Sequence, residues 1–279
     1  MEPNKKQNLI ENPLSDAEQE KEEIPISYVT LFVKVGIIVL SIIMIIGLGI
    51  KVLPDAVTVS NINSKRDLPI YCVDTKEKKV SLSFDAAWGN EDIKTILDIL
   101  AKYDVKATFF MTGEWVSKYP EDVKAIAAAG HDLANHGESH KQMSQLSSEE
   151  CQDEIMKVHD RVKKLTGVEM QLFRPPYGDY NNTVVAAARE CGYYTILWDI
   201  DSLDWKDYGA DSIINKTVDN KKLSNGSIIM MHNEAKYLPD ALERVILGLQ
   251  EKGYELVPVS KLIYTKDYKV DQSGRQYKR

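Results

Sequence analysis

Two histidines four residues apart, His136 and His140, are the first residues of this chain whose type and spacing suggest chemistry. On a helix, side chains at positions i and i+4 lie on the same side, so both imidazoles can converge on one small object. Neutral imidazole is a common ligand of divalent metals. On its own, the pair leaves two interpretations open, a metal site and ordinary surface histidines.

Titratable side chains also follow several strand-like segments. Five such segments end directly before a residue of this kind, and these residues are Asp85, His136, Arg174, Asp201 and His232. Catalytic residues of (β/α) barrels come from the carboxyl ends of several different strands. The pattern therefore predicts that the five side chains meet at one mouth of a barrel.

The elements that position these residues alternate between strand and helix from Lys79 onward. Residues 80–84 alternate apolar and polar side chains, which is typical of a strand. Ser147 and Glu150 form a capping box that opens a helix ending at Gly167. Repeated strand–helix units favour an α/β fold with a parallel sheet, and their number suggests a closed barrel.

Five short motifs carry a resemblance to a known family. In chain order they are Phe84-Asp85, His136-x-x-x-His140, Arg174-Pro175-Pro176-Tyr177, Asp201-x-x-Asp204-Trp205 and Met230-Met231-His232. This ordered set lies between Val80 and Leu262 and resembles the polysaccharide deacetylases, also called carbohydrate esterase family 4 or the NodB-homology domain. The resemblance implies a distorted (β/α) barrel of the NodB-homology type that removes N-acetyl groups from glycans with a divalent metal.

Amide hydrolysis needs a nucleophilic water, a base, a Lewis acid and an acid for the leaving amine. By the resemblance, His136 and His140 hold the metal, for which zinc is expected and cobalt or manganese are alternatives. Asp85 is the base that takes a proton from the attacking water, and His232 is the acid that protonates the departing nitrogen. The expected enzyme is a polysaccharide (peptidoglycan) N-deacetylase, a hydrolase of linear amides.

Two charged residues are expected to support this acid–base pair. Arg174 would hold Asp85 ionised and aim it at the water. Asp201 would hydrogen-bond His232, orient its ring and raise its pKa. Seen alone, Asp85 is also compatible with a helix cap and Arg174 with a structural ion pair.

Three further residues match positions that bind substrate in the family. Tyr177 would give its backbone N–H to the tetrahedral oxyanion, although it is also compatible with a simple turn. Trp205 and Met230 would line the groove that takes the acetyl methyl group. These three residues complete the expected substrate contacts.

The chain departs from the family pattern at Ala86, where the family usually has an aspartate that is the third metal ligand. Alanine has no donor atom, whereas catalytic zinc usually has three protein ligands. Gly137 also stands where the family usually has Ser or Thr. Three outcomes follow: a deacetylase with a weakly bound metal, a catalytically silent glycan-binding or scaffold protein, and an O-acetyl esterase.

The residues before and after the domain have different characters. Residues 1–27 are polar and acidic, which predicts a disordered cytoplasmic tail. Residues 28–53 contain sixteen consecutive uncharged residues, which predicts one transmembrane helix, a signal anchor; a buried core helix and a cleaved signal peptide are the alternatives. We expect a stalk over 54–78, the deacetylase domain over 79–265 and a polar C-terminal tail over 266–279.

These features predict a single-pass protein of the cell membrane with an extracytoplasmic catalytic domain, because the substrate polymer lies outside the bilayer. Anchoring near the membrane favours peptidoglycan over chitin or a secreted exopolysaccharide. The expected partners are therefore an N-acetylated glycan polymer and the lipid bilayer. The net charge of −7, without clustered Lys and Arg, argues against nucleic acid. The three cysteines, at uninformative spacings, indicate no disulfide framework or CxxC zinc site.

Overall fold

A computed structural model describes residues 33–35, 37 and 67–279 of the chain. Its main element is a parallel sheet of eight strands in the order β6-β5-β4-β3-β2-β8-β7, with β9 paired to β2. The strands are β2 (Lys79–Ala86), β3 (Thr108–Met111), β4 (Asp132–Asn135), β5 (Leu172–Phe173), β6 (Tyr194–Thr195), β7 (Ile200–Asp201), β8 (Ile228–His232) and β9 (Glu255–Leu256).

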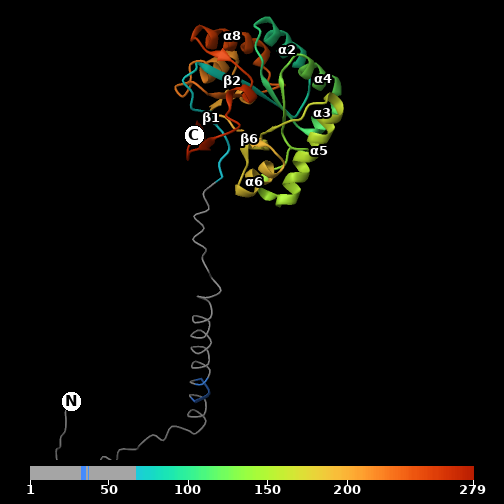
Figure 1. Cartoon of the computed structure of the whole chain (residues 1–279), viewed down its shortest axis with the longest axis vertical. Coiled ribbons are helices and arrows are strands. Elements are labelled where there is room, and N and C mark those ends of the chain that lie inside the picture. Colours follow the sequence, from blue (N-terminus) through green and yellow to red (C-terminus); the bar gives the residue numbers. More distant parts are fainter. Residues whose placement is uncertain (1–32, 36, 38–66) are drawn as a thin grey trace, which may run out of the picture. The chain divides into compact units, whose positions relative to one another are not determined.

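Helices connect these strands and lie around the outside of the sheet (Figure 1). They are α2 (Ile93–Lys102), α3 (Gly113–Lys118), α4 (Pro120–Ala128), α5 (Ser148–Thr166), α6 (Asn182–Glu190), α7 (Ala210–Thr217), α8 (Leu238–Glu251) and α9 (Val259–Leu262). Short 3-10 turns lie at Met143–Gln145, Pro176–Gly178 and Asp204–Lys206. The predicted α/β fold with a parallel sheet is therefore confirmed.

The predicted closure of the barrel is wrong. Strands β6 and β7 are the two edges of the sheet, and no ladder joins them within residues 67–279. A segment from the start of the described domain lies against β6 instead, where Ile70 forms a parallel bridge with Ile196. The fold is thus an α/β half-barrel that is open between its edge strands β6 and β7.

Alternating side chains on β3 show how the sheet separates two apolar clusters. Phe109 packs in the larger cluster, between the sheet and the surrounding helices. Phe110 points to the other side, where it packs with Ala134 and Ile228 in a smaller cluster. Successive residues of a strand face opposite sides, so both faces of these strands are buried. The smaller cluster supports the mouth where the carboxyl ends of the strands meet.

Helix α5 begins and ends where its sequence predicts. The Ser147 side chain accepts a hydrogen bond from the Glu150 backbone, and the Glu150 side chain accepts one from the Ser147 backbone. The helix ends at Gly167, whose φ of 78° is left-handed. Glycine adopts this conformation without a steric penalty. These caps fix the helix that carries Glu154 toward the site.

A second, three-stranded sheet joins the two ends of the described domain. Strand β1 (Cys72–Val73) pairs in parallel with β11 (Arg275–Lys278), which pairs in antiparallel fashion with β10 (Tyr268–Val270). The expectation of a polar tail over 266–279 is therefore wrong, because these residues form a hairpin. Residues 67–78 of the expected stalk likewise belong to the domain. Gln276 is fully buried and bonds both backbone groups of Tyr264.

The predicted anchor, 28–53, lies outside the described residues except for 33–35 and 37. In the part of the chain that the structure describes, no helix is long and apolar enough to cross a membrane. The tail predicted over 1–27 lies entirely outside the described residues.

Candidate active site

The sequence-predicted residues meet at a single cavity of about 670 Å³ at the carboxyl ends of the strands. Its lining includes eight of the nine predicted site residues, namely Asp85, His136, His140, Tyr177, Asp201, Trp205, Met230 and His232. The ninth, Arg174, lies behind the wall and reaches Asp85. The predicted convergence of separate strand ends is therefore confirmed.

Asp85 lies directly beside His232 because their positions are paired on the neighbouring strands β2 and β8. Arg174 donates from Nη1 to Asp85 Oδ1 at 2.5 Å and from Nη2 to Ser83 Oγ at 2.9 Å. The guanidinium carbon lies 3.9 Å from the centre of the Phe110 ring, and the Arg174 side chain is fully buried. These contacts fix Asp85 in one position.

The protonation state of Asp85 is set by two opposing effects. Burial by itself would raise the pKa of this carboxyl, but the positive charge of Arg174 lowers it below its usual value. A carboxylate with a lowered pKa is ionised at neutral pH. Asp85 is thus in the form that can accept a proton from water.

His136 and His140 converge through a loop and not through a helical turn. Both follow β4, and the segment between them contains Gly137 with a φ of 76°, while His140 itself has a φ of 51°. Their ring centroids are 5.1 Å apart. The expected helical i,i+4 geometry is therefore wrong, although the two imidazoles do face the same cavity.

The ring nitrogens of His136 have distinct partners. Nδ1 lies 2.7 Å from the backbone oxygen of Arg174, which can only accept, so we assign the ring proton to Nδ1. Nε2 then faces Asp85 Oδ2 at 3.7 Å. Burial lowers the pKa of His136, and burial together with the nearby His136 lowers the pKa of His140 to about 4. Both rings are neutral at neutral pH, the form that binds metals.

Glu154 on α5 holds the loop between the two histidines. Its carboxylate accepts hydrogen bonds from the Ser139 backbone at 2.8 Å, the Ser139 hydroxyl at 2.7 Å and Lys141 Nζ at 3.0 Å. Asn135 Oδ1 accepts a further bond from the Gly137 backbone at 2.9 Å. These bonds steady a loop that lacks the hydroxyl usual at position 137. Sequence reasoning missed Glu154, because its distance in the chain gives no sign of this contact.

His232 is held by Asp204, and the predicted hydrogen bond from Asp201 is wrong. Nδ1 of His232 donates to Asp204 Oδ1 at 2.8 Å, and the His232 backbone N–H donates to Asp204 Oδ2 at 2.7 Å. Asp201 instead accepts from the Leu203 backbone at 2.8 Å. Leu203 has a φ of 53°, and this left-handed turn directs the chain so that Asp204 meets the ring.

The pKa of His232 is likewise set by opposing effects. Burial alone would lower it, but the hydrogen bond and charge of Asp204 raise it above the usual value. Asp201 adds a smaller effect through its charge. With Nδ1 engaged by Asp204, Nε2 is the nitrogen left to face the cavity. His232 is thus suited to donate a proton from Nε2.

The profile of the polysaccharide deacetylase family matches residues 73–196. The chain is 35% identical over 196 residues to a peptidoglycan-N-acetylglucosamine deacetylase of Bacillus cereus, covering 68% of this chain and 91% of that protein. It is 30% identical over 208 residues to the peptidoglycan-N-acetylmuramic acid deacetylase PdaA of Bacillus subtilis, covering 72% and 77%. This chain belongs to the polysaccharide deacetylase family.

Similar proteins within the family are not all enzymes. Wild-type BA3943 of Bacillus anthracis, described as a CE4 family pseudoenzyme, matches with a TM-score of 0.67 at 33% identity, covering 76% of this chain and 73% of that one. A BA3943 mutant described as having restored enzymatic activity matches with a TM-score of 0.66 at 36% identity, covering 70% of each. The chain also spans 63% of the length of the uncharacterized Bacillus subtilis protein YlxY, at 33% identity.

The side chains around His136 and His140 supply only part of the ligand set of a divalent ion. His136 and His140 are neutral nitrogen donors facing one cavity, as a metal requires. Within residues 67–279, however, no three His, Cys, Asp or Glu side chains form a group that could hold a metal. Ala86 is fully buried in the larger apolar cluster and does not line the cavity. The residues therefore supply two ligands of the usual three.

Aromatic side chains form the outer wall of this cavity. Tyr177 and Trp205 are more than half exposed there, whereas Met230 is buried at the base. Tyr177 has a φ of 61°, an uncommon conformation for a residue with a side chain, and its ring lies 4.5 Å from that of His140. The Trp88 ring also contacts His140 edge-on, with ring centroids 4.9 Å apart. Sequence reasoning gave Trp88 no role in the site, because an isolated Trp is more often a packing residue.

Proposed function

We propose that this chain hydrolyses N-acetyl groups of a cell-wall glycan, peptidoglycan, with the help of a divalent metal. The single observation that carries the proposal is the pairing of Asp85 with His232 on adjacent strands. Arg174 favours the ionised form of one and Asp204 favours the protonated form of the other. A site of this kind can accept a proton and donate another within one cycle.

His136 and His140 would hold the metal, with zinc first and cobalt or manganese as alternatives. Such an ion would supply Lewis acidity and would lower the pKa of the attacking water. Asp85 accepts the proton of the attacking water, and Arg174, which bonds Asp85 through Nη1 and Ser83 through Nη2, keeps the carboxylate aimed into the cavity. Without Arg174, the buried carboxylate would favour its protonated form and lose this capacity.

His232 then donates its Nε2 proton to the glycan nitrogen as the amide bond breaks. Asp204 stabilises the positive charge on the ring before that step and fixes its orientation. The backbone N–H of Tyr177 is proposed to stabilise the oxyanion, and Trp205 and Met230 to contain the acetyl methyl group. Asp201 contributes through its charge at His232, and not through a hydrogen bond to it.

Peptidoglycan is proposed as the substrate for two reasons. Two relatives at or above 30% identity are named peptidoglycan deacetylases. The apolar segment 28–53 supports a single-pass anchor that would place the catalytic domain outside the cell membrane, beside the wall. The lipid bilayer is thus a proposed partner of the N-terminal segment.

The test is acetate release by the purified full chain from peptidoglycan and from N-acetylglucosamine oligomers, with zinc, cobalt or manganese added in turn. We expect metal-dependent release that Asp85→Asn abolishes. Asp132→Asn is the control, because Asp132 lies on β4 outside the cavity and bonds Ser260. Absence of release with every metal would contradict the proposal.

A catalytically silent glycan-binding protein is the second candidate, and one observation favours it. Ala86 removes the third ligand, and BA3943, which is similar to this chain, is described as a pseudoenzyme. This candidate predicts binding of wall glycan without acetate release in the same assay. An O-acetylated glycan, included as a third substrate, identifies an esterase if only its acetate is released.

A further inference from the structure

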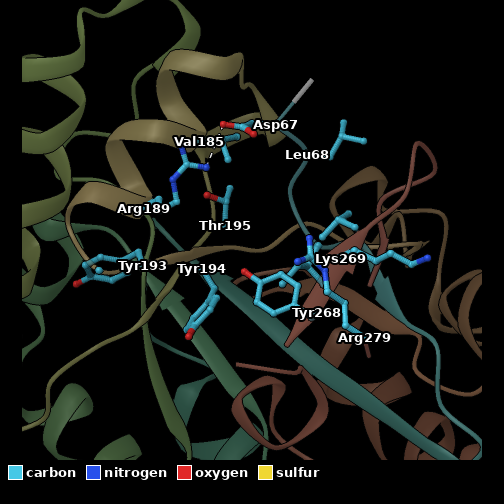
Figure 2. A pocket seen from close by; sticks show the side chains of 13 residues that line it. Asp67, Leu68, Val185, Arg189, Tyr193, Tyr194, Thr195, Tyr268, Lys269 and Arg279 are labelled. Atoms are coloured by element: carbon cyan, nitrogen blue, oxygen red, sulfur yellow. Dashed lines mark hydrogen bonds and ion pairs between the residues drawn. The ribbon is translucent and has the colours of Figure 1, made fainter. Parts of the chain in front are cut away.

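The chain has a second cavity, of about 460 Å³ (Figure 2). It is formed by α6, the start of β6, the segment that begins at Asp67 and strand β10. The two cavities share no lining residue. The chain therefore has a second concave surface that the proposed hydrolysis does not use.

Thr195 places an unpaired hydroxyl in this cavity. The residue is only 6% exposed, and its Oγ1 has no hydrogen-bond partner among the described residues. Figure 2 shows the side chain facing the space below Arg189 and Asp67. A buried hydroxyl without a partner costs free energy, whereas a valine of the same shape would not. A ligand that bonds this hydroxyl would remove the cost.

The charge of the lining favours an anion. Arg189 Nη1 pairs with Asp67 Oδ2 at 3.0 Å, and the Arg189 side chain is 63% exposed, which leaves its other N–H groups available to a ligand. Arg279 also lines the cavity, and Asp67 is the one acidic side chain in the lining. Lys269 extends away, and its ammonium lies 5.7 Å from the centre of the Tyr277 ring. Guanidinium groups bind carboxylates and phosphates through a planar fork.

Two tyrosines form a wall beside these polar groups. The ring centroids of Tyr194 and Tyr268 are 6.3 Å apart, with planes inclined by 57°. The Tyr194 hydroxyl donates to the Thr265 backbone oxygen at 3.0 Å, which fixes that ring. Tyrosine combines an apolar ring with a polar end, so it packs against ligands that have both kinds of surface. A sugar ring, with its C–H faces and hydroxyl edges, is such a ligand.

We propose that this second cavity binds a carboxylate-bearing sugar of the wall glycan. Arg189 pairs with the carboxylate, Thr195 bonds a ring hydroxyl and Tyr268 packs against the face of the ring. The inference rests on the proposed wall-glycan function and extends it. The chain holds the polymer at one cavity while another segment of the polymer enters the catalytic one.

The experiment measures binding of two probes to the full chain by titration calorimetry. One is a soluble wall fragment of alternating N-acetylglucosamine and N-acetylmuramic acid, which carries carboxylates; the other is a neutral N-acetylglucosamine oligomer of equal length. Because either probe can also enter the catalytic cavity, differences between variants carry the result. Thr195→Val is expected to weaken binding of the wall fragment about fivefold and leave the stability of the fold unchanged or higher.

Arg189→Gln is expected to weaken binding of the wall fragment about tenfold. The affinity of Arg189→Lys should lie between those of the unmodified chain and Arg189→Gln, because lysine keeps the positive charge but lacks the planar fork. Arg244→Gln is the matched control, since Arg244 forms an exposed pair with Asp211 at 2.7 Å and lines neither cavity. Thr217→Val is the second control; it removes a buried bond to the Ile213 oxygen, so it lowers stability without changing affinity.

The inference fails if Thr195→Val and Arg189→Gln bind the wall fragment as tightly as the unmodified chain, or if they weaken the neutral oligomer equally. It also fails if inorganic phosphate alone competes at Arg189 as strongly as the wall fragment, because the sugar would then add nothing. Acetate release in the same variants separates the two proposals. If the variants release acetate and bind the wall fragment as tightly as the unmodified chain, only the proposal for the second cavity is rejected. If binding depends on Arg189 but no acetate is released, only the proposed hydrolysis is rejected.

Discussion

The two sides of the catalytic cavity differ in how completely the chain builds them. On the proton-transfer side, Asp85 and His232 lie on adjacent strands, and each has a charged partner, Arg174 and Asp204, within 2.8 Å. These contacts depend on the register of the central strands and on buried side chains. This side therefore has the base and the acid that the proposed hydrolysis requires, each with a fixed partner.

On the metal side, His136 and His140 lie on a loop and have no third protein ligand within residues 67–279. The loop keeps its shape through bonds to Glu154 on a neighbouring helix. The difference teaches that separate elements position the two proposed sets of groups, although Asp85 Oδ2 and His136 Nε2 lie only 3.7 Å apart. We expect variants on the first side to alter turnover, and variants on the second side to alter the metal affinity.

The largest effect is expected for Asp85→Asn. The amide cannot accept a proton from water, so kcat for acetate release should fall about a thousandfold. Arg174 would also lose its buried partner, which costs about 3 kcal/mol or more of stability, so thermal unfolding is measured in parallel. A folded Asp85→Asn variant with unchanged kcat would contradict the role of Asp85 as the base.

Asp204→Asn should lower kcat at neutral pH about a hundredfold. Asp204 raises the pKa of His232, so the ring stays protonated to a higher pH. Activity that needs the protonated ring falls as the pH rises through that pKa. In the variant the fall moves to lower pH, which a profile of kcat against pH detects.

Asp201→Asn is the paired control for Asp204→Asn, because the two residues lie in the same motif and only Asp204 bonds the ring. The profile of kcat against pH should shift less in Asp201→Asn than in Asp204→Asn. Equal displacement in the two variants would contradict the assignment of Asp204 as the residue that positions His232.

Ala86→Asp should strengthen zinc binding about tenfold, because Ala86 is the last residue of β2 and the longer aspartate side chain can extend past the strand end toward His136 and His140. Ala86 is fully buried, so an unpaired carboxylate at this position destabilises the metal-free chain. Stability of the variant should therefore become dependent on added zinc. Calorimetric titration with zinc, and unfolding with and without it, measure both effects; an unchanged affinity would place the metal elsewhere.

The smallest effect is expected for Glu154→Gln, which should weaken zinc binding about fivefold without changing the pH profile of turnover. The amide can still accept one bond but loses the charge that holds Lys141 and Ser139. Lys141→Ala removes one of the three contacts and serves as the milder control. A changed pH profile of turnover, with zinc affinity unaltered, would contradict the assignment of Glu154 as the residue that holds the loop of His136 and His140.

Much of this arrangement could be predicted from the sequence because strand ends and motifs are local signals. Asp85 and His232 lie at the carboxyl ends of β2 and β8, Arg174 directly follows β5, and parallel strands bring such ends together. Local sequence does not show which of Asp201 and Asp204 bonds His232. The choice depends on the left-handed turn at Leu203, which nothing in the composition of the motif reveals.

Long-range pairing was the other limit of sequence reasoning. Residues 266–279 are polar, and their alternation is too short to mark a strand without its partner. Their hairpin exists because β11 pairs with β1 and because Gln276 is buried against Tyr264. The half-barrel also depends on such a contact, since the edge at β6 is covered by the segment around Ile70.

The pairing of β1 with β11 has a mechanical consequence. Tension applied along the backbone at Asp67 first meets the bonds between Ile70 and β6 and then the rungs that join β1 to β11. In the parallel pair, a pull along β1 loads the two residue pairs together in shear instead of opening them one by one. A load on the amino-terminal side is thus absorbed at the rim, and β2 and β8 keep their register.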